Sequence, residues 1–193
     1  MDIRTPVANN YGDLATKFAD TWKSQISRLQ TKFSGAIEET RMPGEFPVDV
    51  PILYVKKDSI IGVLSFLKTE QGFDYGFLAD LTAIDEGPQE GSSVPRFEMV
   101  YNLYSLSTKA RIRVKVRLRE GEEISTAIPV WQGADWAERE VFDMFGIKFT
   151  GHPDLRRILM ADQWQGHPLR KDYPLRGYQL FTEPDPINQS LLD

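Results

Sequence analysis

Residues 96–119 read RFEMVYNLYSLSTKARIRVKVRLR, and this stretch decides the fold. Its two halves, residues 96–106 and 110–119, are rich in aromatic and β-branched residues, which is typical of β-strands. The polar link between them, residues 107–109, is short enough for a tight turn. The stretch therefore predicts an antiparallel hairpin of two long strands.

The second strand of this hairpin alternates between basic and apolar residues, which predicts one basic face. That face would consist of Arg111, Arg113, Lys115, Arg117 and Arg119. Three interpretations stay open: a solvated face, a stripe opposed by carboxylates of a partner protein or of the neighbouring strand, and a nucleic-acid platform. The net charge of −5 and the pI near 5.2 argue against the last of these. We therefore expect no nucleic-acid partner.

Helices and further strands are predicted on both sides of the hairpin. The predicted helices span residues 13–33, 59–69 and 134–145, the first because apolar residues recur there every three or four positions. Asp58 is the expected N-cap of the second helix. The other predicted strands are 51–55, 77–84 and an extended segment at 123–130. Helices with sequential strands on one sheet indicate a two-layer α+β domain over residues 1–145.

The character of the chain changes at residues 146–193. This segment holds five of the twelve prolines, and no apolar period in it lasts longer than one helical turn. Ordering a residue costs about 1–2 kcal/mol of backbone entropy, so such a segment must lie on something to be ordered. It is predicted to be an arm that docks on another protein, with Arg170 and Lys171 paired to carboxylates of that partner.

Several classes of chemistry are excluded by what the sequence lacks. There is no cysteine, so disulfides, thiolate ligation of zinc or iron–sulfur clusters, and cysteine nucleophiles are ruled out. No G-x-S-x-G, G-x-G-x-x-G or Walker A motif occurs. The most apolar stretch, residues 60–67, is far shorter than the roughly 20 residues of a spanning helix. We therefore expect membrane association only through a partner, and a cytoplasmic or equivalent compartment.

The last predicted helix carries the sequence Glu138-Arg139-Glu140-Val-Phe-Asp143. Glu140 and Asp143 lie at i, i+3 and could share a general acid–base site, whereas Arg139 and Asp143 lie at i, i+4 and could form an ion pair. Two carboxylates around an arginine are typical of a salt-bridged helix face, so catalysis is the weaker interpretation.

Two histidines, His152 and His167, occur in similar Gly-His-Pro sequences. A metal would need further carboxylate ligands, at no recognisable spacing. Each histidine is instead predicted to be held by a neighbouring carboxylate or backbone carbonyl.

Residues 136–178 resemble a known family. Glu138-Arg139-Glu140, then Asp143-Met-Phe-Gly146, His152-Pro153, Leu155-Arg-Arg-Ile-Leu159 and Gly166-His-Pro-Leu-Arg-Lys-Asp-Tyr-Pro174 occur in the order seen in the thirty-kilodalton subunit of respiratory complex I, the C-type subunit of bacterial NADH:quinone oxidoreductase. Residues 78–85 and the hairpin strands resemble the family more loosely, and the first 50 residues show little beyond a helix. Ala134-Asp135-Trp136 stands where the family usually has Ala-Asn-Trp.

The resemblance implies a fold and a role. The fold would be a mixed, largely antiparallel sheet packed by helices and followed by an extended irregular arm. The chain would be a scaffold of the peripheral arm of a proton-translocating NADH:quinone oxidoreductase, inactive alone, docking chiefly on the quinone-site subunit. It would carry no cofactor, with FMN and iron–sulfur clusters in partner subunits. An equivalent scaffold of a membrane-bound hydrogenase or formate hydrogenlyase is the alternative.

The resemblance also implies a location and a set of interface residues. The complex would hold the chain at the cytoplasmic side of the bacterial inner membrane, or at the matrix side in an organelle. No residue would be catalytic. The family-motif residues expected at the partner interface are Glu138, Arg139, Glu140, Asp143, His152, Arg156, Arg157, His167, Arg170, Lys171 and Asp172.

Overall fold

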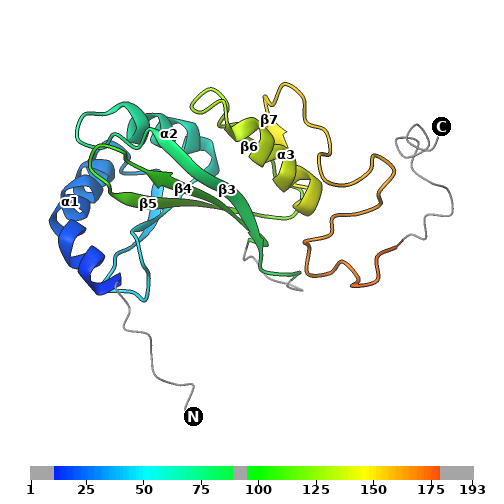
Figure 1. Ribbon diagram of the computed structural model, residues 1–193, viewed down its shortest axis with the longest axis horizontal. Helices are drawn as coiled ribbons and strands as arrows, with labels where there is room; N and C mark the ends of the chain where they lie inside the picture. Colours follow the sequence, from blue (N-terminus) through cyan, green and yellow to red (C-terminus); the bar gives the residue numbers. More distant parts are fainter. Residues whose placement is uncertain (1–10, 89–94, 179–193) are drawn as a thin grey trace, which may run out of the picture. The chain divides into compact units, whose positions relative to one another are not determined.

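The computed structural model describes residues 11–88 and 95–178 (Figure 1). Its helices are α1 (Tyr11–Lys32), the short 3₁₀ helix η1 (Lys57–Ser59), α2 (Ile60–Thr69) and α3 (Ala134–Phe145). Its strands are β1 (Ile37–Arg41), β2 (Ile52–Val55), β3 (Phe77–Asp85), β4 (Phe97–Tyr104), β5 (Arg111–Leu118), β6 (Ile124–Ser125) and β7 (Phe149–Thr150). The predicted α+β class is confirmed.

The main sheet has the strand order β1-β2-β5-β4-β3, and β6 pairs with β7 in a separate two-stranded sheet. β1 runs antiparallel to β2, whereas β2 runs parallel to β5 with Leu53 opposite Val114. The sheet is therefore mixed, as predicted. β4 and β5 are neighbours joined by the turn at residues 105–110, where the Ser105 and Lys109 N–H groups bond the Ala110 and Ser105 carbonyls.

The chain divides into two compact units, and β3, β4 and β5 each contribute residues to both units. The first unit comprises Met1–Asp80 and Val100–Val116, and the second comprises Leu81–Met99 and Arg117–Asp193. The predicted division into a domain at 1–145 and an arm at 146–193 stays a prediction. Residues 179–193 of that arm lie outside the described residues.

The first unit is built on the apolar stripe of α1 and the inner face of the sheet. Phe18, Trp22, Ile26 and Leu29 are buried along α1, as their spacing predicted. Gln25 joins this helix to the segment after α2, since its Nε2 donates to the Gly72 carbonyl and its Oε1 accepts from the Tyr75 hydroxyl. The apolar residues of β5 are buried while its basic residues are not, so the predicted alternation is confirmed.

Two basic residues of β5, Arg113 and Arg117, have polar partners on neighbouring elements. Arg113 donates to the Asn102 side chain and lies 3.5 Å from the Asp49 carboxylate. Arg117 lies 3.9 Å from Glu98 on the adjacent strand. The stripe is thus opposed in part by carboxylates of its own chain.

Three local predictions were wrong. β1 was missed because the sequence IEETR has no apolar alternation, and its pairing with β2 supplies the strand. Asp58 is not an N-cap, because it lies inside η1 and α2 follows from Ser59 without a side-chain cap. Of the predicted extended segment 123–130, only β6 is a strand. Residues 126–131 instead form a turn that leads to α3, in which the Val130 and Trp131 N–H groups both bond the Ala127 carbonyl.

Candidate docking site

The side chain of Asp143, on the last turn of α3, is the centre of the candidate site in the second unit. One carboxylate oxygen accepts the backbone N–H groups of Ile158, Leu159 and Met160 at 2.8–3.0 Å, and the other accepts Arg157 Nη1 at 2.6 Å. The carboxylate is fully buried. Burial raises its pKa, but the three N–H groups and Arg157 outweigh burial, so the pKa is lowered. The ionised Asp143 carboxylate, acting as hydrogen-bond acceptor, therefore holds residues 157–160 in place.

Residues 166–170 complete the C-terminal end of α3. The last carbonyls of a helix have no N–H partner within the helix. Here the Asp143 carbonyl is bonded to His167 Nδ1 (2.9 Å), and the Met144 carbonyl accepts the Leu169 N–H (3.1 Å). The Phe145 carbonyl accepts Arg170 Nε (2.6 Å). The cation of Arg170 also suits the negative end of the helix dipole. Burial lowers the pKa of His167, which favours a neutral ring donating to the carbonyl.

Gly146 makes this close approach possible. It ends α3 in the left-handed conformation, at φ 76°, which glycine adopts at the least cost. A Cβ at this position would lie 2.5 Å from His167 Nε2 and 2.7 Å from Arg170 Nη2. Any other residue would displace both capping side chains.

Arg96, at the start of β4, gathers three carboxylates around one guanidinium. It bonds Asp85 through two nitrogens at 2.8 and 2.9 Å, and it reaches Glu120 and Asp172 at 2.7 Å each. The Lys171 N–H donates to Asp85, and Arg170 pairs with Glu120 at 2.9 Å. Residues 170–172 are thus tied to the β3 end and to Glu120 by charge-assisted hydrogen bonds.

The buried carboxylate of Asp85 has a strongly shifted pKa. Burial raises it, but the bonds from Arg96, the Lys171 N–H and the Gly87 N–H outweigh burial and lower the pKa to about 2. The guanidinium of Arg96 is stabilised in the same way, since its bonds to Asp85 raise its pKa.

These pKa shifts predict loss of the 170–172 contacts in acid. A carboxylate whose native-state pKa is depressed stabilises the fold above its ordinary pKa of 3.8, and the gain disappears as the pH falls to about 2. For Asp85 the stabilisation amounts to about 2 kcal/mol. We expect amide exchange at Lys171, corrected for intrinsic rates, to accelerate between about pH 4 and pH 2. Asp85→Asn should flatten this pH dependence, while the exposed control Asp162→Asn should keep it; an unchanged profile in Asp85→Asn would contradict the assignment.

Glu138 occupies a second buried carboxylate site on α3. Its two oxygens accept the Thr126 hydroxyl and the Ala127 N–H, each at 2.6 Å. Burial raises its pKa. Glu138 thereby fixes the turn after β6 against the helix; Figure 1 shows α3 beside β6 and β7.

His152 and Arg139 hold the loop that follows β7. His152 Nδ1 accepts the Asp154 N–H, so its Nε2 carries the proton of the neutral ring and faces the Asp135 carbonyl at 3.3 Å. Arg139 donates to the carbonyls of Arg156 and Arg157 while stacking over the Trp136 ring. Both histidines are therefore held by neighbouring carbonyls, as predicted.

The two proposed pairings within α3 do not form. Asp143 bonds Arg157 rather than Arg139, and Glu140 is exposed while Asp143 is buried, so Glu140 and Asp143 share no site. Arg156 pairs with Asp154 on the surface. Lys171 is exposed, and among the described residues its ammonium has no ion-pair partner. The expected pairing of Arg170 and Lys171 with another protein of the complex stays a prediction.

Sequence reasoning missed Asp85, Arg96 and Glu120. Asp85 and Arg96 stand at opposite ends of a long turn between two predicted strands, a position that brings strand ends together. Nothing in local spacing, however, links either of them to Asp172.

The described parts of the chain show neither a metal cluster nor a membrane helix. Within residues 11–88 and 95–178, no three His, Asp or Glu side chains are grouped as metal ligands would be. No helix in the same ranges is long and apolar enough to cross a bilayer.

The model of the family described as "Respiratory-chain NADH dehydrogenase, 30 Kd subunit" matches residues 53–179. The chain belongs to this family. The match includes α3 and every residue that caps or anchors it. Relatives of the 30-kDa family agree: the C-type subunit of NADH-quinone oxidoreductase from Trichlorobacter lovleyi is 48% identical over 161 residues, covering 82% of this chain and 93% of the relative.

A second relative joins two subunits in one polypeptide. The fused C/D polypeptide of NADH-quinone oxidoreductase from Bdellovibrio bacteriovorus is 40% identical over 165 residues, covering 86% of this chain and 28% of the relative.

Solved structures share the fold of this member of the 30-kDa family. A trypsin-resistant fragment (1–134) of Nqo5 is 26% identical, with a TM-score of 0.56, covering 70% of this chain and 99% of the fragment. A protein of an archaeal membrane-bound sulfane sulfur reductase aligns with a TM-score of 0.64 over 79% of this chain and 85% of its own length; at 23% identity it shows the fold alone.

Proposed function

We propose that this chain is a non-catalytic scaffold of the peripheral arm of a proton-translocating NADH:quinone oxidoreductase. In this proposal it docks on the quinone-site subunit and supports electron transfer from NADH to quinone. It carries no cofactor of its own, is inactive in isolation, and lies at the cytoplasmic side of the membrane through its partners. The Trichlorobacter and Bdellovibrio relatives both belong to NADH-quinone oxidoreductase, so the NADH-driven complex is proposed over a hydrogenase-type one.

The observation that carries the proposal is a set of exposed apolar side chains on α3 and on the segment anchored to it. Among the described residues, nine large hydrophobic side chains are exposed, and five of them lie between residues 136 and 178. These are Trp136, Leu159, Leu169, Leu175 and Tyr178, and Leu175 is fully exposed. Exposed large apolar side chains gathered in one part of the chain support an interface there. We call these five residues the docking residues.

The polar anchors give the docking residues a fixed backbone. Leu159 donates its N–H to Asp143, and Leu169 donates its N–H to the Met144 carbonyl. Tyr178 packs edge to face on Tyr173, whose own N–H bonds the Arg170 carbonyl. Binding costs less when the contacting groups are already ordered. The anchors therefore serve docking by ordering the segment before the partner arrives.

The choice of partner draws on the relatives. The fused C/D polypeptide of Bdellovibrio bacteriovorus supports a neighbouring position of the C-type and D-type subunits, and we identify the D-type protein with the quinone-site subunit that the family resemblance implies. The trypsin-resistant Nqo5 fragment supports a protease-accessible region in the isolated form of that relative. We propose that residues 146–193 of this chain are likewise more resistant to proteases in the assembled complex than in isolation, because the partner covers the exposed side chains that the anchors leave at the surface.

The proposal is tested by introducing a charge at an exposed docking residue. Leu175→Asp and Leu169→Asp should each weaken assembly by about 2 kcal/mol or more if these residues are interface anchors, roughly a 30-fold loss of affinity. Thermal unfolding of the isolated variants should match the parent, because both side chains are largely exposed. Membranes from the variant strains should lose full-size complex and NADH-driven quinone reduction.

The matched control is Leu106→Asp, the same substitution at an exposed leucine of the β4–β5 turn. It should keep both complex and activity. A full-size, active complex in the Leu169→Asp/Leu175→Asp double variant would rule out this docking surface.

A further inference from the structure

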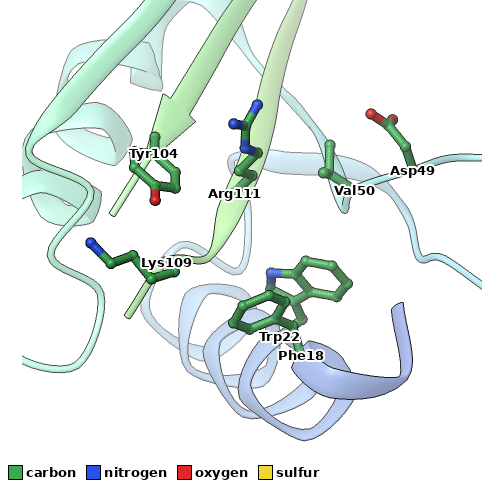
Figure 2. A pocket seen from close by; sticks show the side chains of 7 residues that line it. All are labelled: Phe18, Trp22, Asp49, Val50, Tyr104, Lys109 and Arg111. Carbon is green, nitrogen blue, oxygen red and sulfur yellow. The ribbon is translucent and has the colours of Figure 1, made fainter. Parts of the chain in front are cut away.

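The first unit contains a cavity of about 330 Å³ that the scaffold role does not use. Its floor is formed by Phe18 and Trp22 on α1, whose ring centroids lie 5.5 Å apart (Figure 2). The remaining lining residues are Asp49, Val50, Tyr104, Lys109 and Arg111. The volume is at the lower end of the range for ligand pockets, about 300–1,000 Å³, and suits a ligand with a single ring or branched chain.

The rim of the cavity carries excess positive charge. Lys109 and Arg111 are exposed, and among the described residues neither forms an ion pair with a carboxylate. Arg111 instead stacks over the Tyr104 ring, with its guanidinium carbon 5.2 Å from the ring centroid. The one lining carboxylate, Asp49, lies 3.5 Å from Arg113, which does not line the cavity. Two cations without counter-charges beside an aromatic floor are complementary to an anion with an apolar body.

The backbone of Lys109 supports a role for its side chain. Lys109 lies in the left-handed region, at φ 63°, and its N–H bonds the Ser105 carbonyl. Glycine adopts this conformation without the strain that a side chain imposes. A lysine in this conformation carries backbone strain that a glycine would not, as residues with a functional side chain sometimes do. Figure 2 shows Lys109 and Tyr104 on the side of the cavity opposite the α1 rings, with the Tyr104 hydroxyl directed toward the floor.

We propose that this cavity binds an aromatic or branched aliphatic group that carries a carboxylate. The ring or branched chain packs on Phe18 and Trp22, where it gains apolar and ring–ring contacts. The carboxylate lies at the rim, where Lys109 and Arg111 supply the charge and the Tyr104 hydroxyl can donate a hydrogen bond. The same chemistry is presented by a free small acid and by the C-terminal aromatic residue of a peptide.

The test uses 3-phenylpropionate as probe on the full-length chain, followed by ligand-observed NMR. A ligand of this size should bind saturably with a Kd on the order of millimolar. Its uncharged amide should bind at least about fivefold more weakly, because it lacks the charge that the rim complements. Propionate, which lacks the ring, should show no saturable binding. A short N-acetylated peptide ending in phenylalanine distinguishes the two sources: tighter binding than the free acid indicates a chain terminus, and weaker binding indicates a small acid.

Variants tie the binding to this cavity. Lys109→Gly removes the ammonium and relieves the backbone strain, so it should be at least as stable as the parent while Kd rises about fivefold. Arg111→Gln should raise Kd similarly. Lys23→Gln, an exposed lysine of α1 that does not line the cavity, should bind as the parent does. Equal binding of the acid and its amide, absence of saturation, or an unchanged Kd in a folded Lys109→Gly/Arg111→Gln chain would overturn the proposal.

Discussion

Replacing Asp143 with alanine is expected to lower the free energy of unfolding by about 3–5 kcal/mol, because it leaves buried charge and donors unpaired. The Arg157 guanidinium, whose side chain is only 16% exposed, would lose its carboxylate. The N–H groups of Ile158, Leu159 and Met160 would lose their common acceptor. Urea unfolding followed by tryptophan fluorescence measures the loss, and amide exchange at residues 158–160 locates it.

Two further variants separate the charge of Asp143 from its shape. Asp143→Asn keeps one acceptor oxygen but no charge, so the loss should be smaller, about 1–3 kcal/mol. Asp154→Ala removes an exposed carboxylate that pairs only with exposed Arg156 and should leave the urea midpoint unchanged. If Asp143→Ala unfolds at the same urea concentration as the parent, residues 157–160 are not held by this carboxylate.

Replacing Arg96 with methionine is expected to cost a similar amount, about 3–5 kcal/mol, because Asp85 would remain buried without its counter-charge. The Asp85 side chain is 1% exposed, and among the described residues only the Gly87 and Lys171 N–H groups would still bond it. Its pKa should rise, so acid loss of the Lys171 contact should begin at a higher pH than in the parent. Arg176→Met, at an exposed arginine outside the cluster, is the control.

A double-mutant cycle tests whether the two residues act as a pair. Adding Asp85→Asn to Arg96→Met removes the stranded charge, so the double variant should be more stable than Arg96→Met alone. Additive losses from the two substitutions would show that the pair is not energetically coupled.

The strongest periodic patterns in the sequence predicted the fold correctly. The alternation of β5 and the stripe of α1 each bury one face of a long element, so their residue types report the element directly. β1 and β7 were missed because they exist through pairing rather than through their own patterns. A strand of two residues such as β7 is too short to show an alternation of apolar and polar residues.

The candidate site was predicted in its members but not in its connections. Asp143 was singled out, yet spacing along a helix suggested Arg139 as its partner, whereas the chain returns to supply Arg157. Arg96 and Asp172 are 76 residues apart and were not connected at all. Local spacing rules describe neighbours on one element and carry no information about a segment that folds back.

The fold-back at the end of α3 sets an order of events during synthesis. His167 and Arg170 cap carbonyls that precede them by 24 and 25 residues, and the Lys171 N–H reaches an aspartate 86 residues earlier. At about 5–20 residues per second the caps emerge from the ribosome on the order of one to five seconds after the helix. Until then the carbonyls of Met144 and Phe145 lack the partners that they have in the finished protein. A nascent chain interrupted in this interval would therefore lack the bonds from His167, Leu169 and Arg170 that complete the end of α3 in the finished protein. Only a chain translated past residue 171 can therefore form the complete set of bonds at the end of α3 and at Asp85.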